Sequence, residues 1–206
     1  MIRNLNRILS SLFLTSVFLL SGCASMRPPA ATTTTTPPAT WQQQRTQLEN
    51  INAWQLSSRM GVHLPDNRNL LTSLVWQQQP EQYQITVYSP LNVGSVKITG
   101  NANRVTLWKS ATQSVSAATP EQLMQSQLGW QLPISNMYYW VRSLPAPGST
   151  SQKQFDTSGH LVVLQQQGWT IHYRAFQTVQ QFELPARIEL SDGATRIRIV
   201  VKQWQL

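Results

Sequence analysis

The feature that most constrains this chain is the alternation of apolar and polar residues along short segments between residues 54 and 204. In the stretch 54–64 the even positions are mostly apolar, which is the two-residue period of a strand with one buried face. Turn-forming residues separate the segments, and sequential strands with short connections predict an antiparallel meander. The predicted strands are 54–64, 70–77, 83–88, 95–99, 104–108, 113–117, 153–156, 160–166, 169–173, 187–190 and 195–204.

Three segments predict helices. The first follows Thr40, which can cap it together with Gln43 three positions later. The second begins at Thr119 and Pro120, and the third follows Pro133. The chain is therefore predicted to be mainly β, in the α+β class, with one large antiparallel sheet and a helical insertion. A sheet of about ten strands must stack as two layers or curl.

The amino terminus has the layout of a secretory signal. Arg3 and Arg7 precede the uncharged apolar run Ile8–Leu20, and small residues lead to Cys23, the only cysteine of the chain. A cysteine at this place resembles the lipobox of bacterial lipoproteins, which implies a signal peptide over residues 1–22 and acylation of Cys23. The alternative, an uncleaved membrane helix, is disfavoured because the run is shorter than the roughly 20 residues that span a bilayer.

A Pro- and Thr-rich segment follows the signal. Residues 23–40 contain four prolines and five consecutive threonines, so they cannot bury apolar surface and are predicted to be an extended tether. Residues 41–206 then form one domain of ordinary size, without a second break in composition.

The basic excess of the chain is mild. Removal of residues 1–22, which hold two of the 16 Lys and Arg and none of the 8 acids, leaves (16 − 2) − 8 = +6. These charges are spread along the sequence, which is compatible with weak attraction to anionic lipid or to an acidic partner. An exported chain without a basic stripe is not expected to bind nucleic acid.

Catalytic patterns are sparse. The sequence lacks a Gly-x-Ser-x-Gly elbow and a glycine-rich phosphate loop. His63, His160 and His172 have no metal-ligand spacing, and the scattered acids suggest no glycosidase pair. We therefore expect no enzyme activity, no metal and no cofactor, although an unrecognised Ser or Thr nucleophile leaves an envelope hydrolase as one alternative.

Five segments behind the lipobox, in this order and spacing, resemble the LolB family of outer-membrane lipoprotein receptors. They are 54–59, then 76–78 with 83–85 and 90–91, then 128–133 with 140–141 and 144–145, then 167–173, and finally 184–190 with 196–200 and Trp204. The chain departs from the family pattern at Ser58 and Ser143, where glycine is usual, and at residues 92–94.

The resemblance implies an unclosed antiparallel β-barrel, or half-barrel, with a few helices over an apolar cavity. It also implies that the protein accepts lipoproteins from the periplasmic carrier LolA by binding their acyl chains, and incorporates them into the outer membrane. The protein would be a monomer, lipid-anchored on the periplasmic face of that membrane. Ala24 agrees with this location, because aspartate after the acylated cysteine is the family-level signal for retention in the inner membrane.

Two sets of site residues follow. The resemblance assigns membrane insertion to the loop Pro90, Leu91 and Asn92, with Leu91 dipping into lipid. We also expect the helix that bears Trp140 to act as a plug or gate. The alternation gives the apolar strand residues expected to line the cavity: Leu56, Met60, Val62, Leu74, Ile85, Val87, Val96, Ile98, Ile171, Ile188 and Leu190. Trp140 is expected to complete this lining.

Two further functions remain open beside the hydrolase. One is an envelope lipoprotein that binds a different amphiphile, such as a free lipid or glycolipid, on a similar half-barrel. The other is a structural lipoprotein that binds a protein partner through the sheet, which predicts no apolar cavity.

Overall fold

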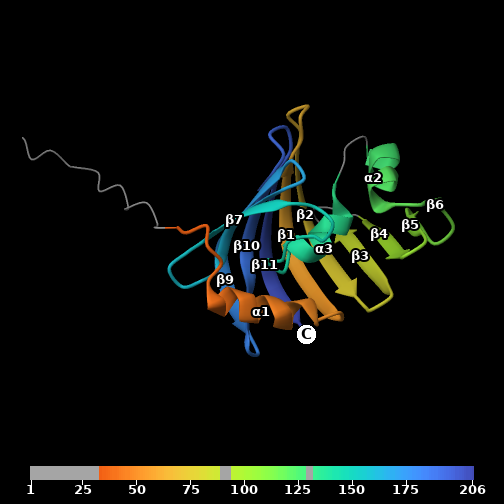
Figure 1. Ribbon diagram of the computed structural model, residues 1–206. Helices are drawn as coiled ribbons and strands as arrows, with labels where there is room; N and C mark the ends of the chain where they lie inside the picture. Colours follow the sequence, from red (N-terminus) through yellow and green to blue (C-terminus); the bar gives the residue numbers. More distant parts are fainter. Residues whose placement is uncertain (1–32, 89–93, 129–131) are drawn as a thin grey trace, which may run out of the picture. The chain divides into compact units, whose positions relative to one another are not determined.

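The computed structural model describes residues 33–88, 94–128 and 132–206 (Figure 1). These ranges contain three helices, α1 (Ala39–Glu49), α2 (Pro120–Leu128) and α3 (Ile134–Trp140). They also contain an 11-stranded sheet, which confirms the mainly β, α+β class. The strands are β1 (Trp54–His63), β2 (Asn69–Gln78), β3 (Gln82–Tyr88), β4 (Ser95–Asn101), β5 (Val105–Trp108), β6 (Ser114–Ala117), β7 (Ser151–Phe155), β8 (Leu161–Gln166), β9 (Trp169–Val179), β10 (Phe182–Ser191) and β11 (Arg196–Gln205).

The sheet is antiparallel throughout and is not closed. Its strand order is β6-β5-β4-β3-β2-β1-β11-β10-β9-β8-β7, so two meanders meet where β1 pairs with β11. The strands β6 and β7 occupy the two ends of this order, which confirms the unclosed sheet expected for a half-barrel. Figure 1 shows the sheet curving behind α1 and α3.

The hairpin of β9 and β10 is longer than the sequence predicted. The two strands were expected to end at Tyr173 and to resume at Arg187, but they continue to Val179 and begin again at Phe182. Pro185 lies inside β10, at a register shift between Pro185 and Arg187. Proline has no N–H to give to the ladder, and the bulge accommodates it inside the strand.

The helix α1 begins at Ala39, earlier than expected. Its N-cap is Pro38, which supplies no side-chain hydrogen bond, so the expected cap at Thr40 is wrong. Just before it, Thr34 exchanges two backbone hydrogen bonds with Phe155 of β7, at 2.9 and 2.8 Å. The described end of the Pro- and Thr-rich segment therefore adds a short bridge to the edge of the sheet.

One face of the sheet packs against the helices. We call it the inner face, and it carries Leu56 and Met60 of β1, whereas the outer face carries Gln55 and Arg59. The inner-face side chains and the helices form a single hydrophobic cluster. The helices contribute Trp41 and Leu48 from α1, Leu123 and Met124 from α2, and Ile134, Met137 and Trp140 from α3. Burying each large apolar side chain stabilises the fold by about 1.5–3 kcal/mol.

Candidate functional site

Ten of the twelve residues predicted to line a cavity are buried, and nine of them lie on the inner face. The ten are Leu56, Met60, Val62, Leu74, Ile85, Ile98, Trp140, Ile171, Ile188 and Leu190. Val87 is half-buried and Val96 is 36% exposed. The ten belong to one cluster with the helical side chains, so side chains fill the space between sheet and helices in this structure. Their role as a cavity lining stays a prediction.

Part of the inner face is exposed to solvent. Leu70, Val96 and Val115 are 41%, 36% and 37% exposed. Directly paired residues of an antiparallel ladder share a face. Leu70 pairs with the buried Val62, Val96 with Val87, and Val115 with the buried Leu107, so all three lie on the inner face. We call these three residues the apolar rim.

Trp140, which lies on the helix expected to act as a plug or gate, is fully buried, and its indole nitrogen and its carbonyl oxygen both form hydrogen bonds to the sheet. Its indole Nε1 donates a hydrogen bond of 2.9 Å to Oε1 of Gln166 on β8. The hydroxyl of Tyr173 on β9 donates to the carbonyl oxygen of Trp140, also at 2.9 Å. Burial raises the pKa of Tyr173, so its hydroxyl stays protonated and remains a donor. The carboxyl end of α3 is therefore fastened to β8 and β9.

The side-chain amide of Gln166 is buried, and both its oxygen and its nitrogen form two short hydrogen bonds. Besides the indole of Trp140, its Oε1 accepts from the backbone N–H of Ala146 at 2.9 Å. Its Nε2 donates to the carbonyl of Ala146 at 2.7 Å and to Oγ of Ser149 at 2.9 Å. The amide thus joins β8 to α3 and to the loop after α3.

Arg142 joins α3 to the end of α1. The residue is 1% exposed, and its guanidinium donates to the carbonyl oxygens of Leu48 at 3.0 Å, Ile51 at 2.6 Å and Tyr138 at 3.1 Å. It also lies 4.3 Å from the ring centre of Tyr138. Burial lowers the pKa of Arg142, and no carboxylate in the described ranges forms an ion pair with it. The carbonyls at the negative end of α1 take the place of a counter-ion.

Sequence reasoning missed Arg142 and Gln166. The signal for Arg142 was a single cation inside the apolar stretch 140–144, which the pattern of a buried helix does not require. Next to it, Ser143 has a φ of 56°, in the left-handed region that glycine adopts without strain. The glycine expected here from the resemblance would adopt this geometry without strain.

Three tryptophans pack against each other on the inner face. Trp54 lies 5.3 Å from Trp76 and 5.5 Å from Trp204 between ring centres, and Tyr138 of α3 lies 6.1 Å from Trp54. All three tryptophans are nearly fully buried. In this structure they fill the core.

The residues expected to anchor and insert lie outside the described residues: Cys23, Pro90, Leu91 and Asn92. Two residues near the segment 89–93 are described, Tyr88 at the end of β3 and Ser95 at the start of β4, and they pair with each other. Tyr88 also pairs with Ser73 of β2, close in sequence to Leu70 of the apolar rim.

The described part of the chain offers no metal-binding group. A cluster of three or more His, Cys, Asp and Glu suited to a metal is absent from it. His63 contacts Asn69 through Nδ1 at 2.9 Å, and His160 contacts Asp156 at 3.1 Å. None of the helices described is long and apolar enough to cross a membrane.

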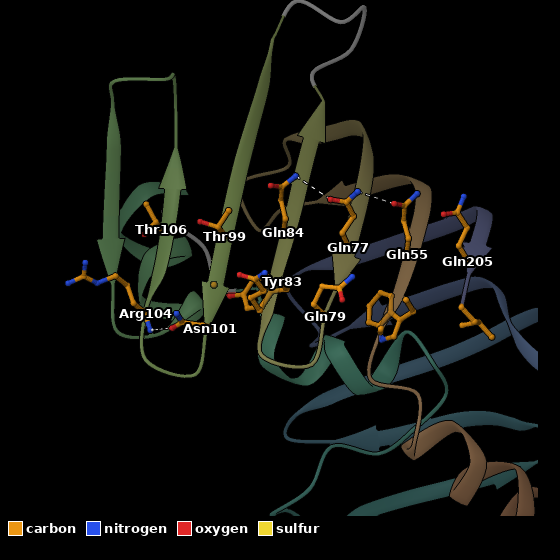
Figure 2. Close-up of a pocket in the computed structure, with 15 residues that line it drawn as sticks. Gln55, Gln77, Gln79, Tyr83, Gln84, Thr99, Asn101, Arg104, Thr106 and Gln205 are labelled. Carbon is orange, nitrogen blue, oxygen red and sulfur yellow. Dashed lines mark hydrogen bonds between the residues drawn. The ribbon is translucent and has the colours of Figure 1, made fainter.

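A polar groove of about 660 Å³ runs along β1 to β5, where Figure 2 shows a row of amide side chains. Nε2 of Gln77 donates to Oε1 of Gln55 at 3.0 Å, and Nε2 of Gln84 donates to Oε1 of Gln77 at 3.4 Å. The amides therefore form hydrogen bonds to one another across three strands, and they make this part of the outer face polar without adding charge. A groove of this chemistry does not suit a fatty acyl chain.

The comparisons with known proteins agree with each other. The sequence model of the family described as "Outer membrane lipoprotein LolB" matches residues 52–204. Outer-membrane lipoprotein LolB of Coxiella burnetii is 43% identical over 190 residues, which cover 92% of this chain and 90% of that protein. Its namesake from Stutzerimonas stutzeri is 35% identical over 187 residues, which cover 91% of this chain and 90% of that protein.

A solved structure has the same fold. A LolA superfamily protein from Nitrosomonas europaea matches with a TM-score of 0.51 and 12% identity, over 80% of this chain and 92% of that one. At this identity the likeness concerns the fold alone. From the sequence matches, the chain belongs to the LolB family of outer-membrane lipoproteins, a family of lipoprotein-localisation receptors and not of enzymes.

Proposed function

We propose that this protein accepts lipoproteins from the periplasmic carrier LolA, holds their acyl chains against its inner face, and releases them into the outer membrane. The observation that carries the proposal is the inner face itself. It is apolar across most of the sheet, is covered by helices over one part, and is exposed at Leu70, Val96 and Val115. A fatty chain loses about 0.8 kcal/mol per CH₂ on leaving water, so a surface of this kind attracts it.

Binding requires the helices to move, because helical side chains occupy the inner face in this structure. Besides this apolar packing, polar contacts fix the helices in place, among them Trp140 to Gln166, Tyr173 to Trp140, and Arg142 to the end of α1. An acyl chain that enters from the apolar rim has to displace apolar side chains of α1 or α3. This competition limits how tightly cargo is held, and a receptor that must release its cargo needs such a limit.

Transfer in this scheme runs downhill from carrier to receptor to bilayer. The sequence offers no glycine-rich phosphate loop, so a nucleotide is not invoked. Each step then needs a more favourable environment for the acyl chains than the step before, and the bilayer is the most favourable.

Release is assigned to the loop of Pro90, Leu91 and Asn92. The strands that lead into and out of this loop, β3 and β4, end beside the apolar rim, since Val87 pairs with Val96. An apolar side chain at such a loop would enter lipid next to the place where the acyl chains leave the protein. The acylated Cys23 would keep the monomeric domain at the membrane throughout.

The test is a transfer assay. LolA loaded with a lipoprotein, the mature acylated protein and liposomes are mixed, and the cargo is followed by sedimentation. We expect cargo to move onto the liposomes with the native protein and with Leu91→Phe, which keeps an apolar loop. Leu91→Glu is expected to take cargo from LolA without passing it on.

Two results would contradict the proposal. Cargo that stays on LolA in the presence of the native protein removes the receptor role, and uptake of free lipid alone would favour a binder of free lipids or glycolipids. Normal transfer by Leu91→Glu removes the role of the loop.

A further inference from the structure

A second groove, of about 600 Å³, lies on the outer face over β2, β1, β11 and β10. Its floor is Gly61, where an added Cβ would meet no atom within 4 Å. Gly61 pairs with Leu71 on one side and with Arg198 on the other, so these two side chains flank it. Leu71 is 68% exposed, the highest value among the large apolar residues that the structure describes as exposed.

The groove is basic. Its ionisable lining consists of Arg59, Arg196, Arg198 and Lys202 against the single carboxylate of Glu189, with His63 beside them. Glu189 is already paired, to Arg174 at 3.0 Å and to Arg198 at 3.2 Å.

The remaining cations of the groove are unpaired. Within the described ranges, Arg59, Arg196 and Lys202 have no carboxylate at ion-pair distance, and all three are exposed. Four cations to one acid leave 4 − 1 = +3 around one groove, with the histidine left out of the count.

Folding creates this cluster from residues that are far apart in the sequence. Arg59 lies on β1 and the other three cations lie on β11, and the pairing of these two strands brings them to one surface. Lys202 falls at the register shift opposite Ser57 and Ser58, where it has no partner residue on β1. The charges that look evenly spread in the sequence are thus concentrated on the outer face.

We infer that this groove is a docking surface for anionic phospholipid in the bilayer to which the protein is anchored. Unpaired guanidinium and ammonium groups match lipid phosphates, and a bulky exposed leucine among cations matches the boundary between headgroups and acyl chains. An acidic protein could also satisfy the charges, and the test below distinguishes it from lipid.

The inference rests on the proposed function in one respect, which is that docking here would set the angle at which the inserting loop meets the membrane. Ser73 pairs with both Arg59 and Tyr88, so Arg59 of the groove, Ser73 and the end of β3 lie in one row across three strands. A bilayer against the groove would therefore also be close to the residues that lead into the loop.

The experiment needs no cargo, and the carrier LolA enters only as a control. The mature acylated protein carries the substitution Ser73→Cys at an exposed position beside the groove. The new cysteine is labelled with an environment-sensitive dye, and the labelled protein is reconstituted into liposomes. The liposomes contain phosphatidylcholine alone or phosphatidylcholine with phosphatidylglycerol. We expect the dye to report an apolar environment only with phosphatidylglycerol, and to lose this signal in high salt. The same dye on Ser114→Cys of β6 is expected to stay in water in both.

The matched variants test the charges and the leucine. Arg59→Gln, Arg196→Gln and Lys202→Gln together should lower the ratio of docked to undocked protein on the order of 100-fold. The control removes the same charge elsewhere, through Lys97→Gln, Arg104→Gln and Lys109→Gln, which are also exposed, and should leave the ratio unchanged. Leu71→Gln should weaken docking with all charges present.

Several outcomes would overturn the inference. These are an equal dye signal in neutral and anionic liposomes, equal effects of the two triple variants, or a signal that appears on neutral liposomes only when LolA is added. The last outcome would assign the groove to a protein partner, the carrier LolA. Because cargo transfer is not measured, failure here leaves the proposed function standing, and failure of transfer leaves this result standing.

Discussion

The indole Nε1 of Trp140 donates to Oε1 of Gln166, and the two residues come from α3 and from β8. Through this bond the buried amide of Gln166 positions α3 on the sheet. Both partners are nearly inaccessible to solvent, with exposed fractions of 0% and 3%. Bonds in such surroundings are costly to leave unmade, so they fix positions more firmly than their net free energy suggests.

Replacement of Gln166 by leucine should therefore be severe. The variant leaves the indole of Trp140 and the backbone N–H and carbonyl of Ala146 without partners. We expect a loss of about 3 kcal/mol in the free energy of unfolding, measured by chemical denaturation. Gln165→Leu, exposed one position earlier on the same strand, is the control and should change this free energy by less than about 0.5 kcal/mol. Similar losses in the two variants would contradict the role of the amide.

Arg142→Met should free the end of α1. The carbonyls of Leu48 and Ile51 lose their donor, and we expect about 2–3 kcal/mol less stability together with faster amide hydrogen exchange in α1 than in the sheet. Arg45→Met removes an exposed ion pair with Glu49 and should cost at most about 0.5 kcal/mol. Uniform exchange across the molecule in Arg142→Met would show that the arginine does not act on α1 in particular.

The side chain of Tyr83 leaves no room for a side chain at position 100, which is occupied by Gly100. The tyrosine ring lies over the glycine, and a Cβ at position 100 would collide with it. Gly100→Ala should therefore destabilise the protein by about 1–3 kcal/mol. Thermal unfolding should show a smaller loss when Tyr83→Ala is already present. Gly61→Ala, which meets open space in the same sheet, should be neutral or stabilising by up to about 1 kcal/mol. Equal losses at the two glycines would contradict the explanation.

The apolar rim can be tested apart from the core. Val96→Gln with Val115→Gln changes side chains that are already more than a third exposed, so the free energy of unfolding should move by less than about 1 kcal/mol. If acyl chains pass over the rim, uptake of lipoprotein from LolA should fall. Ser116→Gln, exposed on β6 beside Val115, is the control. Unchanged uptake in the double variant would show that acyl chains do not enter the protein over the apolar rim.

Much of the fold could be predicted from the sequence because the signals are local. Alternation predicted most of the strands, and it placed Leu56, Met60 and Val62 together on the buried face. The pairing of β1 with β11 has no local signal, since it joins segments that are far apart along the chain. The extension of β10 across Pro185 has no local signal either, because the bulge that accommodates the proline forms only in the paired sheet.

The site was harder to predict for a physical reason. A buried polar residue is recognised by its partners, and those of Arg142 and Gln166 lie on other elements of the fold. The same holds for Arg59 and Lys202, which become a charged surface only after β1 and β11 meet. Val96 alternates like a core residue but lies at the rim, because periodicity reports which face a side chain is on and not how far the cover over that face extends.

The ends of the sheet give the protein a property that a closed barrel lacks. Since β6 and β7 stand at opposite ends of the strand order, a small adjustment of twist at each ladder would alter the curvature of the described sheet without breaking a ladder. If the sheet holds acyl chains as we propose, it can fit cargoes of different width in this way, whereas a closed barrel would first have to break a ladder.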